Sequence, residues 1–343
     1  MSNQILFLGP RLEKKGTLGG VVILFEEIIM HSKKANINHL VVDTNLANYS
    51  SKFFGTISVL INLIFKSYKA NHISLHGTAK DFIYLGPFVV LISKILQKKM
   101  SLRKFAGSFY EVYLGSNFLI KKIIEFVLRN SNFNFFETKY LILKFEKFNK
   151  NTFWWPNSRP KSNLQVSKSF EKRFVFISQI KKTKGIVEFI EASLHLDKSY
   201  VFDIYGPILC DEVESKFNQN ANINYMGVLD HSEVLTTLLK YDVLILPTYH
   251  EGEGYPGIIL EAFSIGMPVI STNWNSIPEI VIDNVNGLLV PIKDALSLKN
   301  AILSIDQNSF EKLRQNAIKS FKHFDSELVN NHFYYKTNSN HHA

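Results

Sequence analysis

The sequence predicts an α/β protein made of two doubly wound, parallel-sheet domains. Short apolar runs alternate with helix-length segments along the whole chain, which is typical of parallel sheets with helices on both faces. At 343 residues the chain is too long for one ordinary hydrophobic core and about the right length for two. The polar stretch NSRPKSN, at residues 157–163, is the best candidate for a linker between them.

Each expected strand is a short apolar run beside a helix-length segment. In the first domain these runs lie at residues 4–8, 38–42, 72–75, 99–104 and 132–136. In the second domain they lie at residues 173–178, 200–205, 222–226, 242–246, 268–271 and 287–290. Ligands of open α/β sheets bind beyond the carboxyl ends of the strands, so the loops that follow strands are the places to search for a functional site.

Composition and charge narrow the class of protein. The chain is 46% apolar and 20% charged, as expected of a globular protein, and its net charge of +9 favours anionic partners such as phosphorylated ligands or an acidic membrane surface. The alternative is that the lysines only keep the helix surfaces solvated and bind no partner. We expect no nucleic-acid partner, because the sequence has no basic-aromatic recognition motif.

Cysteine usage and the apolar runs bear on location. The single cysteine, Cys210, cannot form an internal disulfide, which fits a reducing compartment. The apolar run at residues 5–8 is too short for a secretory signal, and the stretch at residues 83–96 falls short of the roughly 18–20 residues that span a bilayer. We therefore expect a cytoplasmic protein that is soluble or sits on a membrane surface.

The most informative stretch places two carboxylates, Glu253 and Glu261, on either side of a turn rich in glycine and proline. A strand, a loop and a helix N-terminus in this order form a site for an anion, because unpaired backbone N–H groups and the helix dipole point outward there. Carboxylates beside such a site can accept hydrogen bonds from hydroxyls. Phosphate together with a polyol suggests a nucleotide sugar, although either carboxylate could instead have a purely structural role.

Two other loops carry candidate ligand groups. Gly19 and Gly20 end a glycine-rich loop after the first strand and allow the backbone to approach a ligand, although their spacing is not G-x-G-x-x-G. Lys184 stands at the start of a helix expected at residues 186–195, where a cation is unfavourable unless an anion lies nearby. A plain turn and a solvated lysine are the alternatives. His76, at the end of a first-domain strand, is either a site residue or a structural histidine.

In this order the motifs resemble the retaining glycosyltransferases of family 4, which have the GT-B fold of two Rossmann-like domains facing each other across a cleft. The matching motifs are EGYP at 253–256, LEA at 260–262, GMPVI at 266–270, IPEI at 277–280 and NGLLV at 286–290, with support from GG at 19–20, PN at 156–157, KG at 184–185 and YG at 205–206. The resemblance implies an acceptor-side domain at residues 1–160 and a donor-side domain at residues 161–325. The segment at residues 326–343 would pack back on the first domain, with a disordered tail from residue 337.

The resemblance implies a role for each candidate. Glu253, the expected catalytic residue, would hold donor-sugar hydroxyls on the reacting face, and Glu261 would hold the nucleotide ribose. Lys184 would neutralise the donor diphosphate. The loop that ends in Gly19 and Gly20 would lie near the diphosphate and the acceptor. The resemblance implies no cofactor and no metal site.

The phosphate contacts depart from the family pattern in two places. The amides of Gly257 and Ile258 would contact phosphate, but Pro256 replaces a common glycine and removes one N–H donor. Gln179 stands where the family usually has an arginine, so it would donate a hydrogen bond to the donor without bringing a charge.

The first domain departs from the pattern as well, because residues 105–108 read FAGS where the family often has a histidine. The first-domain catalytic residue is therefore open, and Arg103 and Lys104 could supply the missing positive charge.

The expected activity is transfer of a sugar, with retained anomeric configuration, from a nucleotide-sugar donor to a glycan or lipid-linked glycan acceptor in surface polysaccharide or glycoconjugate biosynthesis. The basic, amphipathic segment at residues 118–129 could contact the inner face of an anionic membrane, where lipid-linked acceptors reside; an ordinary packed helix is the alternative. Two rival functions are a nucleotide-sugar epimerase of similar fold and a non-catalytic GT-B subunit.

Overall fold

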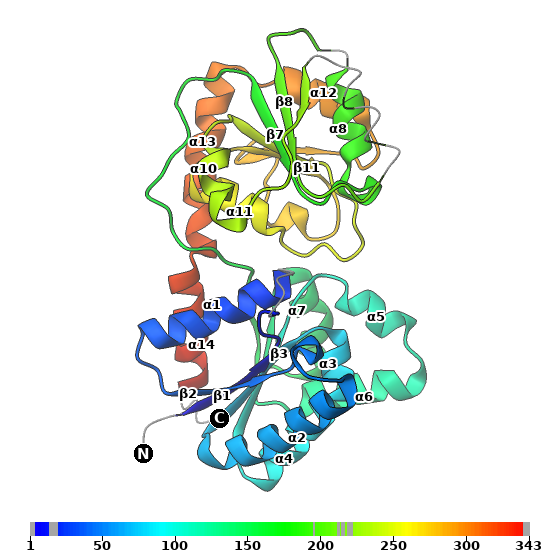
Figure 1. The fold of residues 1–343 in the computed structure, drawn as a ribbon, viewed down its shortest axis with the longest axis vertical. Helices are drawn as coiled ribbons and strands as arrows, with labels where there is room; N and C mark the ends of the chain where they lie inside the picture. Colours follow the sequence, from blue (N-terminus) through cyan, green and yellow to red (C-terminus); the bar gives the residue numbers. More distant parts are fainter. Residues whose placement is uncertain are drawn as a thin grey trace. The chain divides into compact units, whose positions relative to one another are not determined.

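The computed structural model of the chain describes residues 4–13, 20–194, 196–210, 213, 217 and 222–338. The chain divides into two compact units (Figure 1). The first comprises Met1–Asn157 and Ser326–Ala343, and the second comprises Ser158–Asp325. Each unit contains a six-stranded sheet in which all strand pairs are parallel, which confirms the predicted α/β, doubly wound class.

The sheet of the first unit has the strand order β2–β1–β3–β4–β5–β6. Its strands are β1 (Ile5–Gly9), β2 (His39–Asp43), β3 (His72–Gly77), β4 (Lys99–Lys104), β5 (Phe133–Phe136) and β6 (Thr152–Trp154). The first five lie within two residues of the predicted runs. β6, at the edge of the sheet, was not predicted.

The helices of the first unit cover both faces of this sheet. They are α1 (Gly20–Lys34), α2 (Lys52–Lys69), α3 (Ala79–Tyr84), α4 (Gly86–Ile95), α5 (Phe109–Gly115), α6 (Phe118–Asn130), α7 (Lys139–Phe145) and α14 (Ser326–Asn338). Successive residues of β1 enter different cores. Leu6 and Leu8 join the cluster that also includes residues of α2, α4 and α6, whereas Ile5 and Phe7 join the cluster that includes α1 and α14. A strand covered on both faces has to be apolar throughout, as β1 is.

The C-terminal helix α14 completes the second of these cores. The ring of Phe333 stacks on that of Trp155 with 4.3 Å between centroids, and the indole N–H of Trp155 donates to Oδ1 of Asn330 at 3.3 Å. Thr337 is also helical and buried, and its hydroxyl donates to the carbonyl of Phe333 at 2.9 Å. The helix therefore extends into the segment that we expected to be disordered, and residues 339–343 lie outside the described residues.

The sheet of the second unit has the strand order β12–β11–β10–β7–β8–β9. Its strands are β7 (Arg173–Ile177), β8 (Val201–Tyr205), β9 (Ile223–Tyr225), β10 (Val243–Leu246), β11 (Val269–Thr272) and β12 (Gly287–Val290), all within one residue of the prediction. The described helices are α8 (Ile186–Ser193), α10 (Val234–Leu238), α11 (Gly257–Ser264), α12 (Ala295–Leu303) and α13 (Gln307–Phe321). In the described parts of both units, no helix combines the length and apolar character that crossing a bilayer requires.

A chain of buried hydrogen bonds links β3 to β4 in the first unit. His72 Nε2 lies 2.9 Å from Ser101 Oγ, which donates to Ser74 Oγ at 2.8 Å, and Ser74 Oγ lies 2.8 Å from His76 Nε2. Burial lowers the pKa of His72 to about 3 and lowers the pKa of His76 well below its ordinary value. Both imidazoles are therefore neutral in the folded protein at neutral pH.

We predict that mild acid destabilises the first unit. Because both histidines have a lower pKa in the folded than in the unfolded state, the unfolded state binds protons first as the pH falls below about 6.5. Each histidine should then reduce the free energy of unfolding by up to about 1.4 kcal/mol per pH unit. Urea unfolding between about pH 7 and pH 5 measures this slope.

The variant His72→Asn should show a shallower slope than the wild type. A matched control is His231→Asn, which changes an exposed histidine of the second unit. An unchanged slope in His72→Asn would contradict the prediction.

Candidate active site

The candidate site lies at the carboxyl ends of β7 and β10, which are neighbours in the second sheet. From β7 the chain proceeds outward to β8 and β9, whereas from β10 it proceeds in the opposite direction to β11 and β12. Open α/β sheets bind ligands at such a reversal of strand order. Lys184 follows β7 and Glu253 follows β10, so the topology places both predicted residues at this point.

Lys184 and Glu253 form an ion pair. The Nζ atom of Lys184 lies 2.5 Å from Oε2 of Glu253, and the hydroxyl of Thr248 donates to the same oxygen at 2.9 Å. Both charged side chains are largely buried. The sequence indicated each of them separately, one for phosphate and one for sugar, and did not predict that they contact each other. Lys184 also lies just before α8, in the short 3₁₀ turn Lys182–Lys184, and not in the first turn of the helix.

Gly185 brings the two loops of this pair together. Its φ of +78° is in the left-handed region, and a Cβ atom there would lie 2.1 Å from the carbonyl oxygen of Pro247. Beside this contact, the N–H of Tyr249 donates to the carbonyl of Thr183 at 2.8 Å. The loop after β7 is therefore held against the loop after β10, which positions the ion pair.

Glu261 is buried in the second turn of α11 and is paired with Arg159. The Nε atom of Arg159 donates to Oε1 of Glu261 at 2.6 Å. Two backbone contacts hold the arginine: its N–H donates to the carbonyl of Phe324 at 2.9 Å, and its Nη1 donates to that of Ser158 at 2.8 Å. Arg159 was not among the predicted site residues, because it lies in the expected linker. The available signal was Glu261 itself, since a carboxylate in an apolar helix needs a partner.

The guanidinium of Arg159 also lies against the start of α11. A Cβ atom on Gly257 would lie 1.8 Å from Nη2 of Arg159, so only glycine leaves room for the arginine there. The N–H groups of Gly257 and Ile258 are in the first helical turn, where N–H groups have no acceptor within the helix. The guanidinium of Arg159 and the N-terminus of α11 therefore lie side by side, and both attract an anion.

The other predicted site residues are less informative. Gln179 is exposed in the loop after β7, the loop that also carries Lys184. Gly20 is the exposed first residue of α1 in the first unit, and a Cβ atom there would meet no heavy atom of the described residues within 4 Å. Gly19 lies outside the described residues. The structure thus brings together the candidates of the second unit that follow β7 and β10, and places Gly20 in the other unit.

The two cations expected to supply charge from the first domain are buried within their own unit. The guanidinium carbon of Arg103 lies 3.8 Å from the ring centroid of Trp155, and burial lowers its pKa to about 9. Burial likewise lowers the pKa of Lys104 to about 8. His76 is enclosed by aromatic rings, among them Phe7 and Phe25. We expected Arg103 and Lys104 to offer positive charge at this strand end. Instead, both side chains are buried inside the first unit.

A metal site was not expected, and within the ranges that the structure describes no group of three or more histidine, cysteine, aspartate or glutamate side chains could hold a metal ion.

Residues 159–324 match the family model described as Glycosyl transferases group 1. This range is nearly the whole of the second unit, Ser158–Asp325. The match therefore falls on the unit that contains both ion pairs described above.

Curated relatives match parts of the chain. A Klebsiella pneumoniae protein, described as an uncharacterized 41.2 kDa protein in cps region, is 32% identical over 122 residues, which are 35% of this chain and 33% of that protein. A Campylobacter jejuni enzyme, GalNAc-α-(1→4)-GalNAc-α-(1→3)-diNAcBac-PP-undecaprenol α-1,4-N-acetyl-D-galactosaminyltransferase, is 30% identical over 173 residues, or 47% of each chain. The matched part of the chain thus spans about half or less of these relatives.

A solved structure matches nearly the whole chain. The structure of Anabaena Alr3699/HepE in complex with UDP superposes with a TM-score of 0.76 at 14% sequence identity, covering 97% of this chain and 99% of that one. At this identity the match shows the fold alone. The chain has the predicted GT-B class of fold, with two Rossmann-like domains.

We predict that the buried pair of Arg159 and Glu261 is coupled in stability. Arg159→Met leaves a buried carboxylate without its cation, which should lower the free energy of unfolding by about 3–5 kcal/mol. The double variant Arg159→Met/Glu261→Gln removes both charges and should be destabilised less than Arg159→Met alone. Urea unfolding of the wild type, both single variants and the double variant measures the coupling. Additive losses would contradict it.

Proposed function

We propose that the protein is a retaining glycosyltransferase that moves a sugar from a nucleotide-sugar donor to a glycan or lipid-linked glycan acceptor. One observation carries the proposal: two carboxylates, each paired with a cation, stand in the sequence just before and just after the N-terminus of α11. Cations and backbone amides suit the diphosphate of such a donor, and carboxylates suit the hydroxyls of its ribose and its sugar.

The ion pair of Lys184 and Glu253 would exchange partners when a donor binds. Without a donor, each side chain neutralises the other at a distance of 2.5 Å. A bound diphosphate would compete for the ammonium of Lys184, and Glu253 would then be free to accept hydrogen bonds from the sugar hydroxyls. Thr248, which donates to Glu253 at 2.9 Å, would keep the carboxylate oriented during this exchange.

Glu261 would bind the ribose from a position set by Arg159. Its Oε1 atom accepts from the arginine at 2.6 Å, and this contact restricts the direction of the carboxylate. Arg159 would act as a positioning residue, and its Nη2 beside Gly257 would add positive charge to the amides that receive the phosphate. The diphosphate would thus lie near the start of α11, with the ribose on one side and the sugar on the other.

In the proposed reaction the bond between the anomeric carbon and the diphosphate oxygen breaks. The bond from that carbon to the acceptor oxygen forms on the same face of the sugar. Because the acceptor oxygen itself attacks the anomeric carbon, no protein nucleophile is needed. Its proton passes to the departing diphosphate, so no protein base is needed. Lys184 and the N-terminus of α11 would stabilise the charge that develops on the leaving group, and Gln179 would add a neutral hydrogen bond. The proposal requires no cofactor and no metal.

The relatives support the choice of donor and acceptor. The structure of Anabaena HepE has UDP bound, which supports a nucleotide-sugar donor. The name of the C. jejuni enzyme includes a glycan on PP-undecaprenol, which supports a lipid-linked acceptor. We therefore place the activity in surface polysaccharide or glycoconjugate biosynthesis, on the cytoplasmic side of a membrane.

Calorimetric titration with UDP-, GDP- and ADP-sugars tests the donor. We expect selective binding of one nucleotide class, and we expect Glu261→Ala to abolish it because the ribose loses its acceptor. Urea unfolding shows whether that variant is folded. If no donor binds to the folded wild-type protein, the rival reading as a non-catalytic subunit gains support.

A turnover assay tests the role of Glu253. Glu253→Gln should lower turnover by about a hundredfold or more, because a neutral amide holds the sugar hydroxyls less well and leaves Lys184 without its partner. The matched control is Glu251→Gln, which removes the same charge from an exposed position in the same loop and should keep near-normal turnover. Near-normal turnover in Glu253→Gln would remove it from the proposed catalytic role. Formation of an altered nucleotide sugar without acceptor would indicate an epimerase.

A further inference from the structure

Helix α2 of the first unit is apolar on two opposite sides. The buried residues of its inner side are spaced four apart, and they include Val59 and Leu63. Its outer side carries large apolar side chains that are 39–70% exposed: Phe53, Phe54, Ile57, Ile61, Ile64, Phe65 and Tyr68. A surface helix ordinarily has polar residues on its outer side, and a helix that is apolar all round is ordinarily covered.

The neighbouring helices of the same unit extend this apolar surface. Helix α4 packs against both α2 and α6. On and beside α4, the side chains of Tyr84, Phe88, Leu91 and Ile95 are 50–72% exposed. We call these four residues, together with the seven outer residues of α2, the apolar face. Contiguous exposed patches of this kind are rare on soluble monomers and mark interaction sites.

The segment that contains the apolar face is strongly basic. Residues 44–99 include seven lysine residues and a single acidic residue, Asp81. The carboxylate of Asp81 accepts hydrogen bonds from the N–H and the hydroxyl of Thr78, at 2.7 and 2.9 Å. Lys52 and Lys69, at the two ends of α2, are exposed. An apolar surface with a cationic border is complementary to a partner that is apolar inside and anionic outside.

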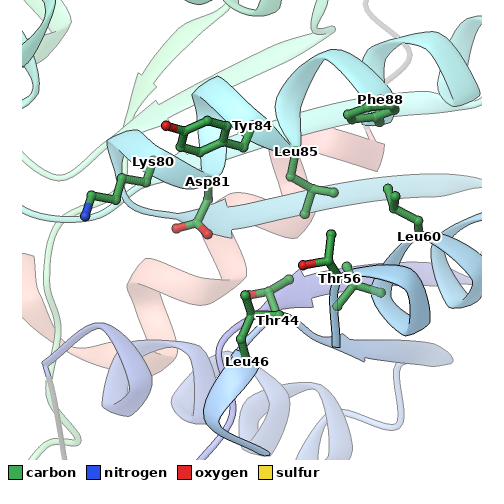
Figure 2. A pocket seen from close by; sticks show the side chains of 10 residues that line it. Thr44, Leu46, Thr56, Leu60, Lys80, Asp81, Tyr84, Leu85 and Phe88 are labelled. Carbon is green, nitrogen blue, oxygen red and sulfur yellow. The ribbon is translucent and has the colours of Figure 1, made fainter. Parts of the chain in front are cut away.

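A pocket of about 500 Å³ lies between α2 and the pair α3 and α4. Its lining includes Leu60 and Leu85, and Tyr84 and Phe88 belong both to the pocket and to the apolar face. Figure 2 shows Leu60 and Phe88 at one end and Lys80 at the other. Asp81 also lines the polar end, beside Lys80, so the pocket suits a hydrocarbon chain that ends in a polar group.

We propose that the apolar face docks on an anionic lipid bilayer and that the pocket receives a hydrocarbon chain from it. A bilayer satisfies both features at once, because apolar side chains enter the acyl boundary while lysines meet anionic headgroups. A second copy of the chain is a poorer match, since two basic faces repel each other. The inference rests on exposure, charge and shape, and does not depend on glycosyl transfer.

The proposal moves the expected membrane contact from α6 to α2 and α4. In α6 the residues Ile124, Val127 and Leu128 are buried in the core, as in an ordinary packed helix. Its Phe118 and Leu119, at the start of the helix, are exposed. The larger apolar area nevertheless lies on α2 and α4.

Vesicle flotation of the full chain tests the docking. We expect binding to vesicles that contain phosphatidylglycerol, little binding to vesicles of phosphatidylcholine alone, and weaker binding at high salt. The variant Phe54→Ser/Phe65→Ser should reduce the bound fraction by about tenfold or more. The matched control is Leu296→Ser/Leu303→Ser, which changes exposed apolar residues on α12 of the second unit and should bind as the wild type does.

The pocket is tested with vesicles whose acyl chains carry bromine, which quenches tryptophan fluorescence on contact. A tryptophan introduced in the pocket by Leu60→Trp should be quenched, whereas one introduced on α12 by Leu296→Trp should not. Equal binding to both vesicle types, unchanged binding of Phe54→Ser/Phe65→Ser, or no quenching of Leu60→Trp would overturn the proposal. So would sedimentation showing that the face forms a dimer. None of these readouts requires turnover, so failure here and failure of the proposed enzyme activity are distinguishable.

Discussion

A parallel sheet has to be covered on both faces, and most features of the two units follow from this constraint. Crossover helices provide the cover, so the strands are apolar along their whole length and all their carboxyl ends meet at one edge. In the first unit the constraint explains why β1 contributes to two cores and why α14 is needed to complete one of them. In the second unit it gathers the loops after β7 and β10 at one point.

Burial makes it costly to leave either carboxylate of the candidate site without a cation. Glu253 and Glu261 both lie in low-exposure surroundings, and each is matched by one cation from a different segment of the second unit. Removal of either cation would leave a charge that water cannot solvate. Gly257 leaves room for Arg159, and Gly185 lets the loop of Lys184 approach the carbonyl of Pro247. The same arrangement gives the proposed donor site its two kinds of group, positive for phosphate and negative for hydroxyls.

On the outer side of α2, by contrast, large apolar side chains are exposed. Local pattern and tertiary packing disagree there, because large apolar side chains remain exposed although the inner side already fills the core. Such disagreement is expected at functional surfaces. The same segment is rich in positive charge, which the composition alone could not assign to a partner: positions 44–99 hold seven lysine residues against one acidic residue.

Local sequence by itself determined the alternation of strands and helices, the class of fold, and the candidates Lys184, Glu253 and Glu261, because each depends on patterns within a few residues. Only the tertiary structure decided their partners. Arg159 and Glu261 are 102 positions apart, and Lys184 and Glu253 are 69 apart. It also decided that β6 forms the edge of a sheet and which side of α2 is exposed. The physical reason is that strand order and helix orientation set these contacts, and neither is encoded in the period of a single segment.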